Sequence, residues 1–126
     1  MSGEHQGTVL VVEDDRGVRD LLVTVLRTEG FEVRTAKDGL EGLLKLRMCA
    51  PSAVVLDIMM PDVGGMRVLD ALAEEQARVP VIVVTGKPEA AEEAIDRLGA
   101  ENVFPKPFDV DELVARIRAV ADRSEG

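Results

Sequence analysis

The chain has 126 residues, 46% of them hydrophobic and 31% charged, which suits one globular domain and excludes a disordered chain. Its net charge of −9 argues against binding of nucleic acid by this chain. No run approaches the roughly 18 apolar residues of a membrane span, and residues 1–7 lack a signal-peptide core, so we expect a cytoplasmic protein. The lone Cys49 excludes an internal disulfide. The lone His5 lies in the polar N-terminal segment, which argues against histidine-based catalysis or metal binding.

Five short apolar runs alternate with five helical patterns, the runs being 9–12, 31–35, 53–56, 81–84 and the weaker 102–104. Such alternation with short loops predicts right-handed crossovers, and therefore a doubly wound α/β fold around a parallel sheet. No repeat or linker divides the chain. We predict one domain over residues 8–121, a disordered tail over 1–7 and a C-terminal tail over 122–126.

The ends of several helices can be placed from their capping residues. Asp38 and Asp109 are expected to cap the second and last helices, because a short acidic side chain accepts hydrogen bonds from the first turn. Gly30 and Gly99 are expected to end the first and fourth helices. The spacing predicts these inward faces, in chain order: Val18, Leu21, Leu22, Val25 and Leu26; Leu40, Leu43, Leu44 and Met48; Val68, Leu69 and Leu72; Ala90, Ala91, Ala94, Ile95 and Leu98; Val110, Leu113, Val114, Ile117 and Val120.

Two of the predicted strands end abruptly in acidic residues. Glu13, Asp14 and Asp15 follow the first run, and Asp57 follows the third. Because ligand sites of parallel sheets lie at the carboxyl ends of the strands, we expect these side chains to meet in one crevice. Like charges about 4 Å apart repel by roughly 4 kcal/mol near a protein surface, so the cluster needs a cation or bound protons. Hard oxygen ligands at a solvent-facing edge favour magnesium or a similar ion.

Four motifs, taken in their order along the chain, resemble those of a known family. They are Val11-Val12-Glu13-Asp14-Asp15, Leu56-Asp57-Ile58-Met59-Met60-Pro61-Asp62, Val84-Thr85-Gly86 and Lys106-Pro107-Phe108. Together they resemble the receiver domain of bacterial two-component response regulators, over roughly residues 8 to 121. The resemblance implies a flavodoxin-like fold with a five-stranded parallel sheet of order 2-1-3-4-5 and five helices.

The resemblance also implies a function. Receivers accept a phosphoryl group from a sensor histidine kinase or phosphotransfer protein, and the modification switches a downstream effector protein or domain. They phosphorylate and slowly dephosphorylate themselves, so we do not expect an enzyme with external substrates. Dimerisation through the last strand and the two last helices is common in the family, which makes a homodimer a further expectation. Here, however, the acidic residues of the fourth helix offer no clear complementary patch: Glu89, Glu92, Glu93 and Asp96.

By the resemblance, Asp57 is the phosphoacceptor, and a carboxylate is a competent nucleophile toward phosphorus. Asp14 matches the residue that ligates Mg²⁺ directly, and Glu13 the one that acts through a metal-bound water. Asp57 and the backbone carbonyl of Met59 complete the implied ligand set, which is sparse, as Mg²⁺ prefers. Asp15 is open to two interpretations, a further acid of this cluster or the cap of the first helix, and we favour the cap.

Lys106 and Thr85 complete the implied site. The Lys106 ammonium is expected to pair with Asp57 before modification and with the phosphoryl group afterwards. The family usually holds the bond between this lysine and Pro107 in the cis form. The Thr85 hydroxyl is expected to move inward and to donate a hydrogen bond to the phosphoryl group, for which Gly86 leaves room.

The sequence departs from the family at one switch position. Val103 stands where many receivers have tyrosine or phenylalanine, three residues before the lysine. The neighbouring Phe104 should point to the opposite face of its strand and pack in the core, so we expect the switch to rest mainly on Thr85 and the loop after it. Pro105 lacks a backbone donor, which predicts an edge strand.

Two further positions are expected to tune loss of the phosphoryl group: Met59, two residues after Asp57, and Lys87, two after Thr85. A methionine can neither orient a water molecule nor remove its proton. We therefore expect the phosphorylated form to be long-lived compared with receivers that carry a polar side chain there.

Three other functions are compatible with parts of this pattern. A flavin or nucleotide binder needs a phosphate-cradling loop after the first strand, where the acidic residues 13–15 would repel phosphate. A phosphatase with an aspartate nucleophile needs Asp-x-Asp, and Asp57-Ile58-Met59 lacks the second acid. The remaining alternative is a pseudo-receiver, a docking module not regulated by phosphorylation, against which the complete residue set argues. Between a stand-alone receiver and one domain of a larger regulator, we expect the former.

Overall fold

The computed structural model describes residues 7–58, 70 and 79–125. Met59 and the predicted inward face of the third helix, Val68, Leu69 and Leu72, lie outside this part of the chain. The strands are β1 (Thr8–Val12), β2 (Glu32–Ala36), β3 (Ala53–Asp57), β4 (Val81–Thr85) and β5 (Val103–Pro105). The helices are α1 (Arg16–Thr28), α2 (Gly39–Cys49), α4 (Pro88–Leu98) and α5 (Val110–Glu125), with a 3₁₀ turn at Ala100–Asn102. Among the described residues, no helix is both long and apolar enough to cross a membrane.

The strands form one parallel sheet of order β2-β1-β3-β4-β5, which confirms the predicted topology. Its register aligns the carboxyl ends of the strands. Val12 pairs with Leu56 across β1 and β3, and Thr85 pairs with Pro105 across β4 and β5. Consequently the residues at or just after these four strand ends lie along one edge of the sheet.

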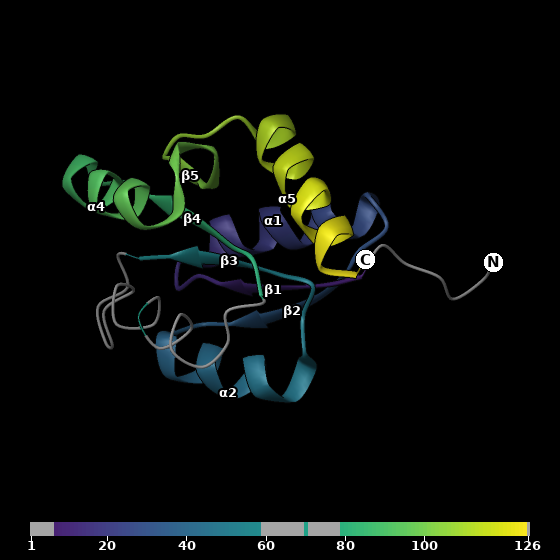
Figure 1. Cartoon of the computed structure of the whole chain (residues 1–126). Coiled ribbons are helices and arrows are strands. Elements are labelled where there is room, and N and C mark those ends of the chain that lie inside the picture. The colour runs from purple at the N-terminus through teal and green to yellow at the C-terminus, as the bar shows by residue number, and fades with distance from the viewer. Residues whose placement is uncertain (1–6, 59–69, 71–78, 126) are drawn as a thin grey trace.

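Helices cover both faces of the sheet: α1 and α5 lie on one side and α2 on the other (Figure 1), and α4 packs against the same core cluster as α2. Alternate residues of β1 point to opposite faces of the sheet. Val9 and Val11 pack toward α1 and α5, whereas Leu10 and Val12 pack toward α2 and α4. All four are at most 1% exposed. Burying such a side chain contributes roughly 1.5–3 kcal/mol, which explains why β1 is apolar on both faces.

The capping predictions are confirmed, except that Glu29 and not Gly30 is the C-cap of α1. The side chain of Asp38 accepts a hydrogen bond from the Glu41 amide at 2.8 Å, and that of Asp109 accepts one from the Glu112 amide at 3.0 Å. Gly99 ends α4 with a φ of 93°, a conformation that favours glycine. Gly30, with a φ of 99°, directly follows the cap of α1.

The predicted apolar face of α2 is wrong for three of its four residues, whereas the fourth, Leu43, packs against the core. Leu40, Leu44 and Met48 are 61%, 55% and 81% exposed, and the helix instead buries Gly39, Gly42 and Leu46. The spacing of large apolar residues misled the prediction, because glycine has no side chain to reveal that its side of the helix faces the sheet. Among the described residues of the other helices, two predicted inward residues are exposed as well, Leu21 at 46% and Ile95 at 36%.

Gly42 brings α2 into close contact with β1. A Cβ atom at position 42 would lie 3.0 Å from both Cγ1 and Cγ2 of Val12, the last residue of β1. Rotation of the Val12 side chain cannot remove the close contact entirely, because each staggered rotamer leaves at least one methyl group near this point. The absence of a side chain at position 42 therefore sets how closely α2 approaches the strand that leads into the acidic residues.

We predict that Gly42→Ala destabilises the protein by about 1–2 kcal/mol, because overpacking outweighs the gain of about 1 kcal/mol in helix propensity. Chemical denaturation of native and variant proteins measures the difference. In a Val12→Ala background the same substitution should be neutral or stabilising, since only the propensity gain remains. Equal destabilisation in both backgrounds would contradict the contact as its cause.

Candidate functional site

Four strand ends deliver polar side chains to one edge of the sheet. Glu13 and Asp14 directly follow β1, Asp57 ends β3, Thr85 ends β4 and Lys106 directly follows β5. The strands β1, β3 and β4 are runs of mostly buried aliphatic residues, which fixes the positions of their ends, whereas β5 is a short edge strand with only Val103 buried. The edge therefore brings together residues that lie up to 93 positions apart in the chain.

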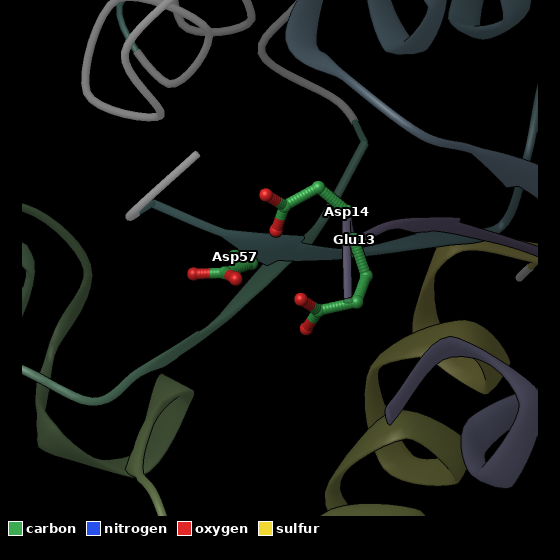
Figure 2. A group of neighbouring side chains, drawn as sticks. All are labelled: Glu13, Asp14 and Asp57. Carbon is green, nitrogen blue, oxygen red and sulfur yellow. The ribbon is translucent and has the colours of Figure 1, made fainter. Parts of the chain in front are cut away.

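Three carboxylates converge at this edge. Ligand atoms of Glu13, Asp14 and Asp57 all lie within 4.8 Å of one another, and Figure 2 shows the three carboxyl groups turned toward a common space. Glu13 and Asp57 are buried at 1% and 3% exposure, whereas Asp14 is exposed. Two like charges about 5 Å apart repel by roughly 3 kcal/mol at an effective dielectric constant of 20. This arrangement therefore needs compensating positive charge.

Lys106 supplies part of that compensation. Its Nζ lies 3.4 Å from Oδ2 of Asp57 and 3.3 Å from Oε1 of Glu13. The resemblance led us to expect the pair with Asp57, but the pair with Glu13 was not predicted. No local sequence signal could have found it, because it depends on the packing of β1 and β5 in the folded sheet.

The crowding changes the proton affinity of Glu13. Burial, together with the hydrogen bond and the negative charge of Asp57, raises the pKa of Glu13 from 4.5 to about 7, against the opposing effects of the Asp15 amide and Lys106. For Lys106, burial alone would lower the pKa, but the attraction of Asp57 and Glu13 outweighs it and leaves the pKa raised. One ammonium group thus does not neutralise the cluster fully.

Thr85 is fully buried, at 0% exposure, beside Lys106. The Lys106 amide donates a hydrogen bond to the Thr85 carbonyl at 2.7 Å, and the Thr85 hydroxyl accepts one from the Lys87 amide at 3.2 Å. Lys87 is the N-cap of α4. The threonine therefore connects the strand end at the acidic edge with the start of α4.

Asp15 caps α1 and confirms the favoured interpretation. Its side chain accepts a hydrogen bond from the Val18 amide at 3.0 Å, while its own amide donates one to Oε2 of Glu13 at 3.1 Å. The group of acids close enough to share a metal ion contains Glu13, Asp14 and Asp57 but not Asp15.

The predictions for the last strand are confirmed. Val103 belongs to the core cluster beneath α2 and α4, whereas Phe104 packs against the cluster beneath α1 and α5, so the two side chains point to opposite faces. Pro105 lies on β5, which is an edge strand of the sheet. The peptide bond between Lys106 and Pro107 is cis.

The donor set fits a hard divalent cation such as Mg²⁺. It consists of carboxylate oxygens at the solvent-facing edge of the sheet, with one carboxyl group, Glu13, driven toward protonation by its neighbours. A cation would replace that proton and relieve the repulsion. Met59, whose carbonyl the resemblance adds to this set, lies outside the described residues.

Comparison with known proteins agrees with this geometry. The family model described as "Response regulator receiver domain" matches residues 9–118. The probable transcriptional regulatory protein TcrX of Mycobacterium tuberculosis is 39% identical over 119 residues, which cover 93% of this chain and 50% of TcrX. A CpxR homologue of Haemophilus influenzae is 41% identical over 92% of this chain and 51% of its own length. The chain thus spans about half the length of these relatives.

Solved structures give the same result. A CheY-like receiver domain protein of Methanospirillum hungatei superposes with a TM-score of 0.84 at 28% identity, covering 94% of this chain and 95% of the other. The receiver domain of the Francisella response regulator 1452 has a TM-score of 0.83 at 28% identity, covering 93% and 98%. Fold, family model and curated relatives agree that the chain belongs to the receiver domains of two-component response regulators.

Proposed function

We propose that Asp57 accepts a phosphoryl group from the phosphohistidine of a sensor histidine kinase or phosphotransfer protein, in a reaction that requires Mg²⁺. The observation that carries the proposal is the position of the Asp57 carboxylate. It lies within 4.8 Å of two other carboxylates and 3.4 Å from the ammonium of Lys106. This is the charge arrangement that a phosphoryl transfer to a carboxylate requires.

In the proposed reaction, a carboxylate oxygen of Asp57 attacks phosphorus. The new oxygen–phosphorus bond forms as the phosphorus–nitrogen bond to the donor histidine breaks, and the imidazole of the donor leaves with the bonding electron pair. The Lys106 ammonium, already beside Asp57, counters the negative charge on the transferring group. The Thr85 hydroxyl, one strand away, donates a hydrogen bond to it after transfer.

Mg²⁺ would be held by Asp14 and Asp57, by the backbone carbonyl of Met59 and, through a water molecule, by Glu13. When bound, it supplies positive charge that the phosphoryl oxygens need as they approach three carboxylates. The residues of the chain provide the nucleophile, the ammonium group and the rigid edge of the sheet at which the phosphoryl donor would bind.

Phosphorylation is proposed to act through protein contacts, in the cytoplasm. Movement of Thr85 would displace the Lys87 end of α4, and an effector protein or domain would bind the altered surface. A second copy of this chain is one such candidate partner. The net charge of −9 disfavours direct contact with nucleic acid. The alternative is a pseudo-receiver that docks without phosphorylation, and the first experiment below separates the two.

We predict that incubation with acetyl phosphate and Mg²⁺ adds one phosphoryl mass to the native protein, measured by intact mass spectrometry. Asp57→Asn, which keeps the shape but loses the nucleophile, should gain nothing. Chelation of the metal with EDTA should abolish the gain in the native protein. An unmodified native chain after prolonged incubation would favour the pseudo-receiver.

The raised pKa of Glu13 predicts a pH-dependent stability of the metal-free protein. Because the folded state binds the proton more tightly than the unfolded chain does, this stabilisation is complete below pH 4.5 and is lost as the pH rises through about 7. Glu13→Gln cannot titrate. The free energy of unfolding of the native protein should therefore fall relative to that of Glu13→Gln between these pH values.

Thermal or urea unfolding across this pH range, in EDTA, measures the effect. Saturating Mg²⁺ should restore stability to the native protein above pH 7 and do so less for Glu13→Gln. Glu92→Gln is the matched control, since it removes a carboxylate from the exposed surface of α4 and leaves the acidic cluster intact. A constant difference between native and Glu13→Gln proteins would contradict a shifted Glu13.

Met59→Asn tests the expected lifetime of the phosphorylated form. We predict that the substitution shortens the half-life of the phosphoryl group, because an amide can orient an attacking water molecule and a thioether cannot. Purified phosphorylated proteins are diluted into phosphodonor-free buffer with Mg²⁺ and followed by intact mass. Met59→Leu, which is equally unable to hold a water molecule, should keep the native half-life.

A further inference from the structure

Arg19 on α1 contacts the acidic turn formed by Glu13, Asp14 and Asp15. Its Nη1 donates a hydrogen bond to the backbone carbonyl oxygen of Glu13 at 3.0 Å, and its side chain is partly buried there. The Arg19 amide donates a second hydrogen bond, to the carbonyl of Asp15 at 2.9 Å. The second bond is the first backbone bond of α1, which any residue other than proline would make at position 19, so only the guanidinium bond to Glu13 is specific to arginine.

The carbonyl that Arg19 holds belongs to the peptide group between Glu13 and Asp14. On the other side of Glu13, its amide donates to the Ala36 carbonyl of β2 at 3.0 Å. Rotation of the peptide between the two acids would redirect the Asp14 side chain, which is exposed and has little packing of its own. Repulsion of the Asp14 carboxylate by Glu13 and Asp57 favours such a rotation. The hydrogen bond from the Arg19 side chain opposes it.

We propose that Arg19 is a positioning residue, which presents Asp14 and Glu13 for binding of a divalent cation without touching the cation itself. The inference rests on the proposed function, because it concerns the same acidic edge. A charge-assisted hydrogen bond to a ligand-bearing backbone is stronger than a neutral one, and loss of such a supporting group lowers metal affinity by roughly tenfold or more.

The sign of the effect separates positioning from simple electrostatics. A cationic side chain near a metal site repels the metal ion, so removal of a positive charge alone should tighten binding or leave it unchanged. Removal of a positioning bond should weaken it. Arg16 provides the matched control, because it lies on the same helix one turn earlier and pairs with Asp20 at 3.7 Å on the exposed surface.

The test measures Mg²⁺ binding to the full chain by isothermal titration calorimetry, without any phosphodonor. We expect Arg19→Met to weaken binding roughly tenfold, and Arg19→Lys, which keeps a cationic donor, to recover part of the loss. Arg16→Met should bind as tightly as the native protein or slightly more tightly. An Arg19→Met affinity equal to that of Arg16→Met would overturn the proposal.

A second readout uses metal-free protein. Amide hydrogen exchange by NMR should be faster at Asp14 and Asp15 in Arg19→Met than in the native protein, with unchanged exchange in the core of β1. Faster exchange without weaker Mg²⁺ binding would overturn the proposal and reduce Arg19 to a structural role. If Arg19→Met does not fold, Arg19→Lys is compared with Arg16→Lys, and equal affinities would overturn it.

The outcomes for Arg19 and for the proposed function are distinguishable. Native protein that binds Mg²⁺ but gains no phosphoryl mass would refute the phosphoacceptor role and leave the positioning role standing. If the native protein gains the phosphoryl mass but Arg19→Met does not change the Mg²⁺ affinity, the positioning role is refuted and the phosphoacceptor role stands.

Discussion

Electrostatic repulsion among Glu13, Asp14 and Asp57 is the constraint on which the arrangement of the site depends. The strands β1 and β3 force these acids together, since their ends are fixed by burial in the centre of the sheet. Lys106 offsets part of the charge through contacts with two of the three acids. The remaining negative charge can be offset by a proton on Glu13 or by the proposed divalent cation. The fold therefore holds the site ready for positive charge, at a cost in stability that its aliphatic core offsets.

Most of the fold could be predicted from the sequence because the signals were local and consistent. Continuous runs such as Val9–Val12 occur where a strand is covered on both faces, and an abrupt end in acids marks the solvent edge. Each of the five strands lies within one residue of its expected bounds. The convergence of Asp14 and Asp57 followed from parallel topology alone, since parallel strands present their carboxyl ends to one edge.

The features that could not be predicted depend on contacts between distant residues or on glycine residues, which have no side chain. The buried side of α2 consists partly of Gly39 and Gly42, which give no hydrophobic signal. The second partner of Lys106 and the contact of Arg19 with a backbone carbonyl are set by distances in the folded chain, not by residue type. Arginine on an amphipathic helix is usually a solvated side chain, so its sequence position alone carried no information.

The connection between Thr85 and Lys87 makes the first turn of α4 sensitive to the rotamer of one side chain. No side chain caps this helix at Lys87, and the amide there finds its acceptor in the threonine hydroxyl. Rotation of the Thr85 side chain about its Cα–Cβ bond would break this hydrogen bond, and the Lys87 amide would then donate to water. A change of one torsion angle in the sheet would thereby alter the support of a helix end that is exposed to solvent.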